Sequence, residues 1–322
     1  MEVANFESQQ SCKSCIFLPL DAKRQKYSII AGYNDGSVRK LCSSVGRCVE
    51  SSPCHNLRAV TCVSSNKDGS VFASSGKDSR VAVWSGGRVV GACLCTDTVN
   101  SVHFFGTQQI LTASRDKLVS LIDVETQTVT RVAANHREGV LKAVGEAEYS
   151  LCATASTDNT ARLTDTRSQR PQHILKHDKW VYDVAANFSK NLIVTGSRDA
   201  SVKVWDVRCP ERILCRFDGH TKGVTTCALS ETGSLLASGS SDRTVKIWSL
   251  RDGILYTFSN HTDGVSSVNF NHPGRDLLVS SSHDGSVRVY DLAHYERIRA
   301  TSFTSCTEIP ADVSEKIVSY LW

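Results

Sequence analysis

The sequence lacks the features that mark a membrane protein, an exported protein or a strongly basic nucleic-acid-binding domain. No stretch approaches the roughly 18 apolar residues that a membrane helix needs, and no basic segment followed by an apolar run opens the chain. The formal net charge is only +4, from 37 Lys and Arg against 33 Asp and Glu. So small a charge does not argue for nucleic acid. We therefore expect no membrane contact and no direct nucleic-acid binding.

The sequence is also poor in methionine and in catalytic motifs. A single Met excludes a Met-rich groove for helical partners. No P-loop, Gly-x-Gly-x-x-Gly, His-Glu-x-x-His or Gly-x-Ser-x-Gly pattern is present, so we expect no enzyme, no cofactor and no small-molecule substrate. Cys12 and Cys15 form a lone Cys-x-x-Cys pair, and a metal or redox role would need both sulfurs to converge. Positions three apart on a strand face opposite sides, and the pair aligns with Val265 and Val268 of the last repeat, so we favour packing residues over a metal or redox pair. Without an export signal, the scattered cysteines predict a cytoplasmic or nuclear protein.

One short block recurs seven times along the chain, at a spacing of about 42 residues. Each copy has a small or hydroxyl residue, then an aspartate, then an alternating strand. The seven aspartates are Asp35, Asp78, Asp116, Asp158, Asp199, Asp242 and Asp284. Chance would not place seven turn aspartates at this spacing with the same strand after each. The repeat therefore organises nearly the whole chain.

Each repeat carries four short strands separated by Gly, Asp and Ser turns. Around Asp199, for example, alternating or apolar runs cover 202–206, 213–217, 224–229 and 235–238. Four such strands predict an antiparallel meander. One small sheet cannot bury both of its faces, whereas a closed ring of sheets buries them against one another. We therefore predict an all-β fold.

The Gly219-His220 and Trp205-Asp206 pairs, at this repeat length, resemble the WD-repeat family over roughly residues 5–303. The resemblance implies a seven-bladed β-propeller, with a propeller domain over 1–303. In that family a His, a Ser or Thr, the turn Asp and a Trp form a buried hydrogen-bonded network. The fifth and sixth repeats match it in full, with His177, Thr195, Asp199, Trp205, His220, Ser238, Asp242 and Trp248.

The second repeat also matches in full, with His55, Ser74, Asp78 and Trp84, whereas the remaining four match this network less completely. The seventh has Tyr290 in the Trp position, the fourth has Thr164, the third has Ile122 and lacks the His, and the first keeps only Asp35. We interpret the recurring His and Asp residues as structural supports. A catalytic dyad would not repeat around a ring.

The family resemblance also implies where a partner binds, over the central channel on the face that carries the loops entering the first strand of each blade. Three positions per repeat map to that rim. They are Ser11, Lys13, Asn34, Ala59, Thr61, Lys77, Thr98, Asn100, Arg115, Gly139, Leu141, Thr157, Trp180, Tyr182, Arg198, Gly223, Thr225, Ser241, Gly264, Ser266 and His283.

The fifth repeat places Trp180, Tyr182 and Arg198 on this rim, and these residue types are the ones most enriched at binding hot spots. Further cationic or titratable side chains come from Lys13, Lys77, Arg115 and His283. Aromatic side chains beside cations suit an acidic or phosphorylated peptide. In the alternative interpretation, Trp180 packs between loops and the cations are merely solvated. The leading hypothesis is a scaffold that binds other proteins, as a subunit of a multiprotein complex.

A second hypothesis rests on Trp205-Asp206-Val207-Arg208 and on Thr164-Asp165-Thr166-Arg167 one repeat earlier. Paired motifs of this kind resemble those of substrate receptors that dock on the adaptor of a cullin-4-type ubiquitin ligase. In that reading Arg167 and Arg208 contact the adaptor. In the other, each arginine bonds to its own turn.

The chain after the last repeat follows a different pattern. Residues 304–322 form a tail in which Pro310, Val313, Ile317, Tyr320 and Leu321 predict a short amphipathic helix. Its apolar stripe needs either the side of the propeller or a partner to pack on. Two segments, 3–8 and 298–303, are both candidates for the outer strand of the last blade, and the pattern leaves this choice open.

Overall fold

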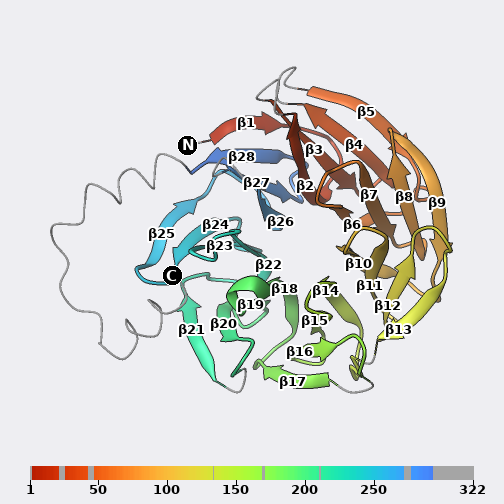
Figure 1. Ribbon diagram of the computed structural model, residues 1–322. Helices are drawn as coiled ribbons and strands as arrows, with labels where there is room; N and C mark the ends of the chain where they lie inside the picture. The colour runs from red at the N-terminus through yellow and green to blue at the C-terminus, as the bar shows by residue number, and fades with distance from the viewer. Residues whose placement is uncertain are drawn as a thin grey trace.

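Seven small antiparallel sheets are arranged in a ring in the computed structural model (Figure 1). The structure describes residues 2–21, 26–42, 47–132, 134–168, 171–209, 212–271 and 277–292. Each sheet has four strands. The first strand of each repeat lies nearest the axis of the ring (Figure 1). The seven-bladed β-propeller expected from the repeats is thus confirmed. The helix expected in 304–322 and the strand expected at 298–303 lie outside the described residues.

Blades 1 to 4 follow one another in chain order. Blade 1 has β2 (Cys12–Asp21), β3 (Lys26–Tyr33), β4 (Ser37–Cys42) and β5 (Arg47–Pro53). Blade 2 has β6 (Val60–Ser65), β7 (Val71–Gly76), β8 (Arg80–Ser85) and β9 (Arg88–Leu94). Blade 3 has β10 (Val99–Phe105), β11 (Gln109–Ser114), β12 (Val119–Asp123) and β13 (Val129–Val132). Blade 4 has β14 (Val140–Glu146), β15 (Leu151–Ser156), β16 (Thr160–Asp165) and β17 (Pro171–Lys176).

Blades 5 to 7 complete the ring. Blade 5 has β18 (Val181–Asn187), the short 3₁₀ turn η1 (Phe188–Lys190), β19 (Leu192–Ser197), β20 (Ser201–Asp206) and β21 (Ile213–Asp218). Blade 6 has β22 (Val224–Leu229), β23 (Leu235–Ser240), β24 (Val245–Ser249) and β25 (Gly253–Phe258). Blade 7 has β26 (Val265–Phe270), β27 (Leu277–Ser282) and β28 (Val287–Asp291), and its fourth strand is β1 (Glu2–Phe6).

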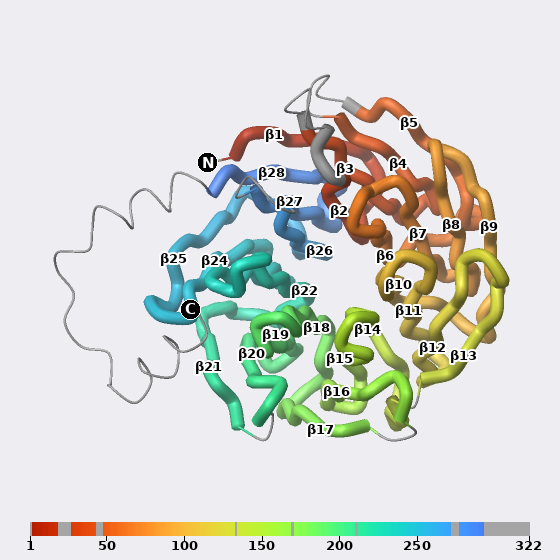
Figure 2. Tube along the Cα trace, in the orientation of Figure 1, coloured from red at the N-terminus to blue at the C-terminus, as the bar shows by residue number. Residues whose placement is uncertain are grey.

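The ring is closed by the N-terminal strand. β1 pairs antiparallel with β28, with Phe6 opposite Val287 (Figure 2). Phe6 is 5% exposed and packs in a cluster that joins blade 7 to blade 1. Of the two segments that the sequence pattern left open, the structure therefore has the N-terminal one in the outer place of blade 7.

The turn aspartate of each full repeat begins a buried chain of hydrogen bonds. In blade 5, His177 Nδ1 lies 3.1 Å from Asp199, His177 Nε2 lies 2.7 Å from Thr195 Oγ1, and Trp205 Nε1 donates to the same oxygen at 2.9 Å. Burial lowers the pKa of His177, and its bond to Asp199 opposes that shift only in part. The neutral ring can then donate from Nδ1 and accept at Nε2, which satisfies the polar groups of this buried site.

Blade 6 repeats this arrangement with the other four network residues. His220 Nδ1 lies 2.8 Å from Asp242 and His220 Nε2 lies 2.8 Å from Ser238 Oγ, while Trp248 Nε1 donates to Ser238 Oγ at 2.7 Å. Burial alone would raise the pKa of Asp242, but the hydrogen bonds from His220 and Thr244 outweigh it and hold that pKa well below its usual range. The carboxylate is therefore charged and tied into the fold.

The incomplete repeats use substitutes for the missing members. In blade 1, Arg39 donates to Asp35 at 2.6 Å and lies over the Tyr33 ring at 4.1 Å. In blade 3, the hydroxyl of Thr96 donates to Asp116 in place of a histidine. These contacts keep each turn aspartate bonded, so the blade shape survives the loss of His and Trp.

Polar side chains on the inner strands tie neighbouring blades together. Asp183 of β18 accepts the Cys227 N–H of β22 at 2.8 Å, and Ser14 of β2 accepts the Val63 N–H of β6 at 3.3 Å. At the closing seam, Ser266 of β26 donates to the Cys12 carbonyl of β2 at 2.7 Å. These bonds satisfy backbone groups that the sheets themselves leave unpaired.

Cys12 and Cys15 are both buried in the cluster at that seam, in keeping with their interpretation as packing residues. Among the described residues, no helix is long and apolar enough to cross a membrane.

Candidate functional site

One backbone hydrogen bond, repeated in all seven blades, defines the channel mouth. The residue before each turn aspartate donates its N–H to the carbonyl of the residue that enters the first strand. The seven bonds run from Asn34, Lys77, Arg115, Thr157, Arg198, Ser241 and His283 to Ser11, Ala59, Thr98, Gly139, Trp180, Gly223 and Gly264. The predicted rim positions are therefore structurally equivalent around the ring.

The channel mouth carries positive charge and no carboxylate at these positions. Each repeat contributes three rim positions. Together these positions hold Lys13, Lys77, Arg115, Arg198 and His283, but neither Asp nor Glu. Carboxylates do lie in the adjoining loops, among them Asp178, which lines a cavity with Trp180, and Asp263, which acts on Lys13. The rim side chains themselves attract acidic groups and repel basic ones.

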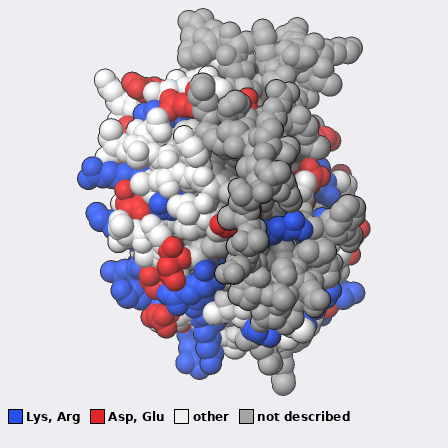
Figure 3. Space-filling model, turned by 90° about the vertical axis from the view of Figure 1, so that its left-hand side faces the viewer, with Lys and Arg blue, Asp and Glu red and all other residues white. Residues whose placement is uncertain are grey.

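The side of the propeller offers a contrast. Figure 3 shows Lys and Arg side chains interspersed with Asp and Glu over the side that it presents. A mixed surface produces no strong field, because charges of opposite sign partly cancel within a Debye length of about 8–10 Å.

Blade 5 presents the aromatic part of the mouth. Trp180 is 42% exposed although it is a large apolar side chain. The Arg198 guanidinium lies over its ring, 4.9 Å from the centroid, and the Tyr182 ring meets it edge-on with centroids 6.4 Å apart. The three residues predicted from the sequence are therefore brought together. The Arg198 guanidinium over its face and the Tyr182 ring at its edge hold the indole in place while leaving part of its surface to solvent.

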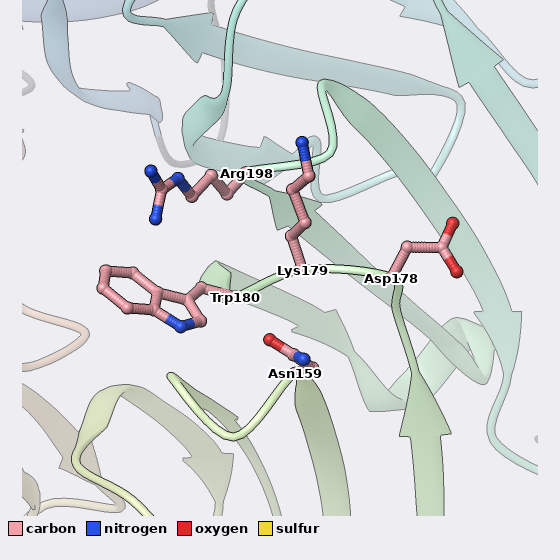
Figure 4. Close-up of a pocket in the computed structure, with 5 residues that line it drawn as sticks. All are labelled: Asn159, Asp178, Lys179, Trp180 and Arg198. Carbon is pink, nitrogen blue, oxygen red and sulfur yellow. The ribbon is translucent and has the colours of Figure 1, made fainter.

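A shallow cavity of about 380 Å³ lies beside this group. Trp180 and Arg198 line it together with Asn159, Asp178 and Lys179. Figure 4 shows the Trp180 indole and the Arg198 guanidinium extending to the same side, whereas the Asp178 carboxylate points away from them.

Sequence reasoning missed three of these lining residues. Asp178 and Lys179 immediately precede Trp180 in the loop that enters β18, and this adjacency was the available signal. Asn159 comes from the turn of blade 4, where its φ of 65° is left-handed. Its position beside Trp180 depends on how blade 4 packs against blade 5, which the sequence pattern does not specify.

A second group lies at the seam between blades 7 and 1. His283 Nδ1 is 3.1 Å from Lys13 Nζ and 3.0 Å from Ser11 Oγ. Burial and then the nearby Lys77 ammonium lower the pKa of Lys13. The remaining predicted residue, Arg115, is exposed on blade 3 and shares no described contact with either group. The seven predicted partner-binding residues thus separate into an aromatic group, a seam group and Arg115.

On the inner strands, Lys142 lies close to a thiol and a carboxylate. Lys142 of β14 donates to Cys62 Sγ of β6 at 3.7 Å, so its side chain reaches past blade 3 to blade 2. Burial alone would lower the pKa of Lys142, but the nearby Cys62 and Asp183 outweigh it and raise that pKa. This lysine therefore connects the inner strands of blades 2 and 4.

Arg167 and Arg208 lie at the other end of their blades, because each follows the third strand rather than the turn before it. Arg167 donates to Asp165 at 3.0 and 2.8 Å, and Arg208 donates to Asp206 at 3.2 and 3.2 Å. Their side chains are 73% and 57% exposed. Each arginine therefore bonds to its own turn, and both also present surface on adjacent blades.

The His and Asp pairs of blades 5 and 6 are closed to a substrate, because the Thr195 and Ser238 hydroxyls that they contact are fully buried and each accepts the Trp N–H of its own blade. Within the part of the chain that the structure describes, no three His, Cys, Asp or Glu side chains gather as metal ligands would.

Comparisons with known proteins agree with the repeat fold. The family model described as WD domain, G-beta repeat matches residues 46–85, 169–206, 211–249 and 253–291. The chain is 28% identical over 211 residues to the angio-associated migratory cell protein of Homo sapiens, an alignment that covers 57% of this chain and 47% of that protein.

Two further relatives are similar at the same level. The U5 small nuclear ribonucleoprotein 40 kDa protein of Dictyostelium discoideum is 29% identical over 165 residues, covering 48% of this chain and 45% of that protein. The ribosome biogenesis protein WDR12 homolog of Drosophila virilis is 27% identical over 213 residues, covering 57% and 49%. The alignments thus span about half the length of these curated relatives. Seven blades, the repeated turn network and the family match together show that the chain belongs to the WD-repeat family of β-propeller proteins.

Proposed function

We propose that this protein is a non-catalytic scaffold that binds other proteins and captures an acidic or phosphorylated segment of a partner on its channel mouth. The capture site is the group of Trp180, Tyr182 and Arg198 on blade 5. A half-exposed tryptophan stacked under an arginine, on a mouth without rim carboxylates, is the observation that carries this proposal.

The chemistry of the group suits such a segment. The exposed part of the Trp180 indole buries apolar surface of the partner, which contributes about 25 cal/mol per Å² removed from water. The Arg198 guanidinium donates charge-assisted hydrogen bonds to a carboxylate or phosphate. Stacking on Trp180 already orders this arginine, so binding costs less side-chain entropy than it would for a freely rotating one.

The relatives support the general class. One is named as a small nuclear ribonucleoprotein component and another as a ribosome biogenesis protein, and none of the three names describes an enzyme. By analogy we propose that this chain is a subunit of a multiprotein complex in the nucleus or cytoplasm. Fold alone does not choose the partner, since one propeller architecture serves many functions.

The test is capture of partners by the purified chain, followed by mass spectrometry. The double variant Trp180→Ala/Arg198→Ala should lose the main partner and keep its melting temperature, because both side chains lie at the surface. The control is Tyr256→Ala/Arg216→Ala, which removes an exposed aromatic and an arginine from the outer strands β25 and β21. Retention of every partner by the first variant would refute the proposal.

A second candidate function is docking to a ubiquitin-ligase adaptor through Arg167 and Arg208. The exposure of both guanidinium groups on adjacent blades favours it, although each group already bonds to an aspartate of its own turn. The variant Arg167→Ala/Arg208→Ala should release a cullin-4-type adaptor and leave the partner bound at the channel mouth. If no adaptor is captured by the unchanged chain, this second candidate is wrong.

A further inference from the structure

The seam group of the channel mouth has an unusual hydrogen-bonding arrangement. His283 Nδ1 faces two donors, Lys13 Nζ at 3.1 Å and Ser11 Oγ at 3.0 Å. A nitrogen that accepts carries no proton, so the neutral ring holds its proton on Nε2. The lysine comes from β2 of blade 1 and the histidine from the turn of blade 7. In this state His283 therefore holds the Lys13 ammonium across the seam.

Both cations and carboxylates surround this contact. Partial burial and the Lys13 ammonium lower the pKa of His283, while Asp263 and Asp284 oppose that shift. Asp284 is already bonded to His261 Nδ1 at 3.1 Å. Asp263 is exposed on the loop, where its interaction with the cations is screened.

Lys13 has a further cationic neighbour. Burial, followed by the charge of Lys77 on blade 2, lowers the pKa of Lys13, and Asp263 opposes that shift only weakly. Lys13 is half-buried and Lys77 is exposed. An anion that reaches both removes their mutual repulsion and supplies each with an acceptor.

We infer that the seam group of Lys13, Lys77 and His283 binds a phosphate monoester and takes up one proton on His283 as it does so. The inference rests on the proposed function and names the phosphate-binding part of the channel mouth, distinct from the aromatic group on blade 5. A phosphate monoester carries up to two charges and three acceptor oxygens. It therefore matches two ammonium groups and an imidazolium better than a carboxylate does.

The proton matters because it changes what His283 can hold. Once Nδ1 is protonated it becomes a donor, and the Lys13 Nζ contact becomes a meeting of two donors. The ammonium must then turn away from the ring and towards the bound oxygens. Proton uptake, release of Lys13 and phosphate binding are therefore coupled, and the site strengthens as the pH falls through the range in which His283 titrates.

The test is a titration of the full chain with phenyl phosphate, followed by NMR of histidine Cε1–H resonances, with the His283→Gln variant assigning the peak. We expect a saturable shift of the His283 resonance and a rise of about one unit in its pKa, which is about tenfold tighter binding at the lower pH. Inorganic sulfate keeps a constant charge over this range, so the same pH dependence with sulfate assigns the proton to the protein.

Matched variants distinguish a specific phosphate-binding site from non-specific electrostatic attraction. Lys13→Gln and Lys77→Gln should each weaken phenyl phosphate binding about tenfold. Lys117→Gln removes the same charge from the turn of blade 3, where the ammonium lies 4.0 Å from Glu138, and should change the affinity less than about twofold.

Two results would overturn the inference. One is a His283 resonance that does not move with phenyl phosphate at concentrations on the order of 10 mM. The other is an equal loss of affinity in the Lys117 variant. Either result would leave the proposed function standing if Trp180→Ala/Arg198→Ala still loses its partner. Conversely, a phosphate-binding seam in a chain whose partners ignore Trp180 would refute the blade 5 capture site alone.

Discussion

The contribution of the hydrogen bond from Trp205 to Thr195 to the free energy of unfolding can be measured by making the same isosteric change, Thr to Val, in two blades. Thr195→Val replaces a fully buried hydroxyl with a methyl group of nearly the same size. It removes the acceptor of Trp205 Nε1 at 2.9 Å and the partner of His177 Nε2 at 2.7 Å. An orphaned buried polar group costs about 1–3 kcal/mol, and two are orphaned here, so we expect a loss of about 2–6 kcal/mol in the free energy of unfolding.

Blade 4 supplies the matched control. Thr154 is equally buried, and its Oγ1 also lies 2.7 Å from a histidine, His136 Nε2. Thr154 Oγ1 lies 3.3 Å from the Arg162 carbonyl, as Thr195 Oγ1 lies 3.4 Å from the Lys203 carbonyl. Thr164 occupies the Trp position of this blade, so Thr154→Val orphans one partner only. The expected cost is about 1–3 kcal/mol.

The assay is urea unfolding followed by circular dichroism, with the slopes compared so that the midpoints report stability. The difference between the two variants estimates the contribution of the Trp205 N–H bond, and we expect about 1–3 kcal/mol. The Trp205→Phe variant, alone and combined with Thr195→Val, completes a double-mutant cycle. Equal losses for Thr195→Val and Thr154→Val would refute the view that the tryptophan N–H depends on this acceptor.

Two further predictions concern ring closure and acid. Phe6→Ala should lower the free energy of unfolding by about 3–5 kcal/mol. Val3 lies on the same strand with its side chain 50% exposed, so Val3→Ala should change that free energy by less than about 0.5 kcal/mol. Equal urea midpoints for the two variants would contradict closure by β1. Burial lowers the pKa of His136, His177 and His261 in the fold, so below about pH 6.5 the unfolded chain binds protons that the folded chain does not. Urea midpoints should therefore fall between about pH 7.5 and 5, and a constant midpoint would contradict this reasoning.

The turn aspartates should extend the acid dependence to lower pH. Asp199 and Asp284 are held well below their usual pKa, because hydrogen bonds outweigh the effect of burial. A group with a depressed pKa stabilises the fold above its unfolded value, near 3.9, and loses that contribution as pH falls towards its folded value.

Much of this protein could be predicted from local sequence. The seven turn aspartates and the strand after each indicated the blade number, because each blade is built from residues close together in the chain and its pattern repeats without reference to the others. The positions of Trp180, Tyr182 and Arg198 on one rim followed from the same repeat, since equivalent residues of equivalent blades occupy equivalent places.

What joins one blade to another depended on the tertiary structure. Closure by β1, the contact of Lys13 with His283, and the reach of Lys142 to Cys62 each connect residues of different blades. No periodic pattern encodes such pairs, because they arise from how side chains of unequal length meet around the axis. The repeat itself determined the ring of seven blades, whereas the packing between blades decided how the ring closes and where its charged side chains gather.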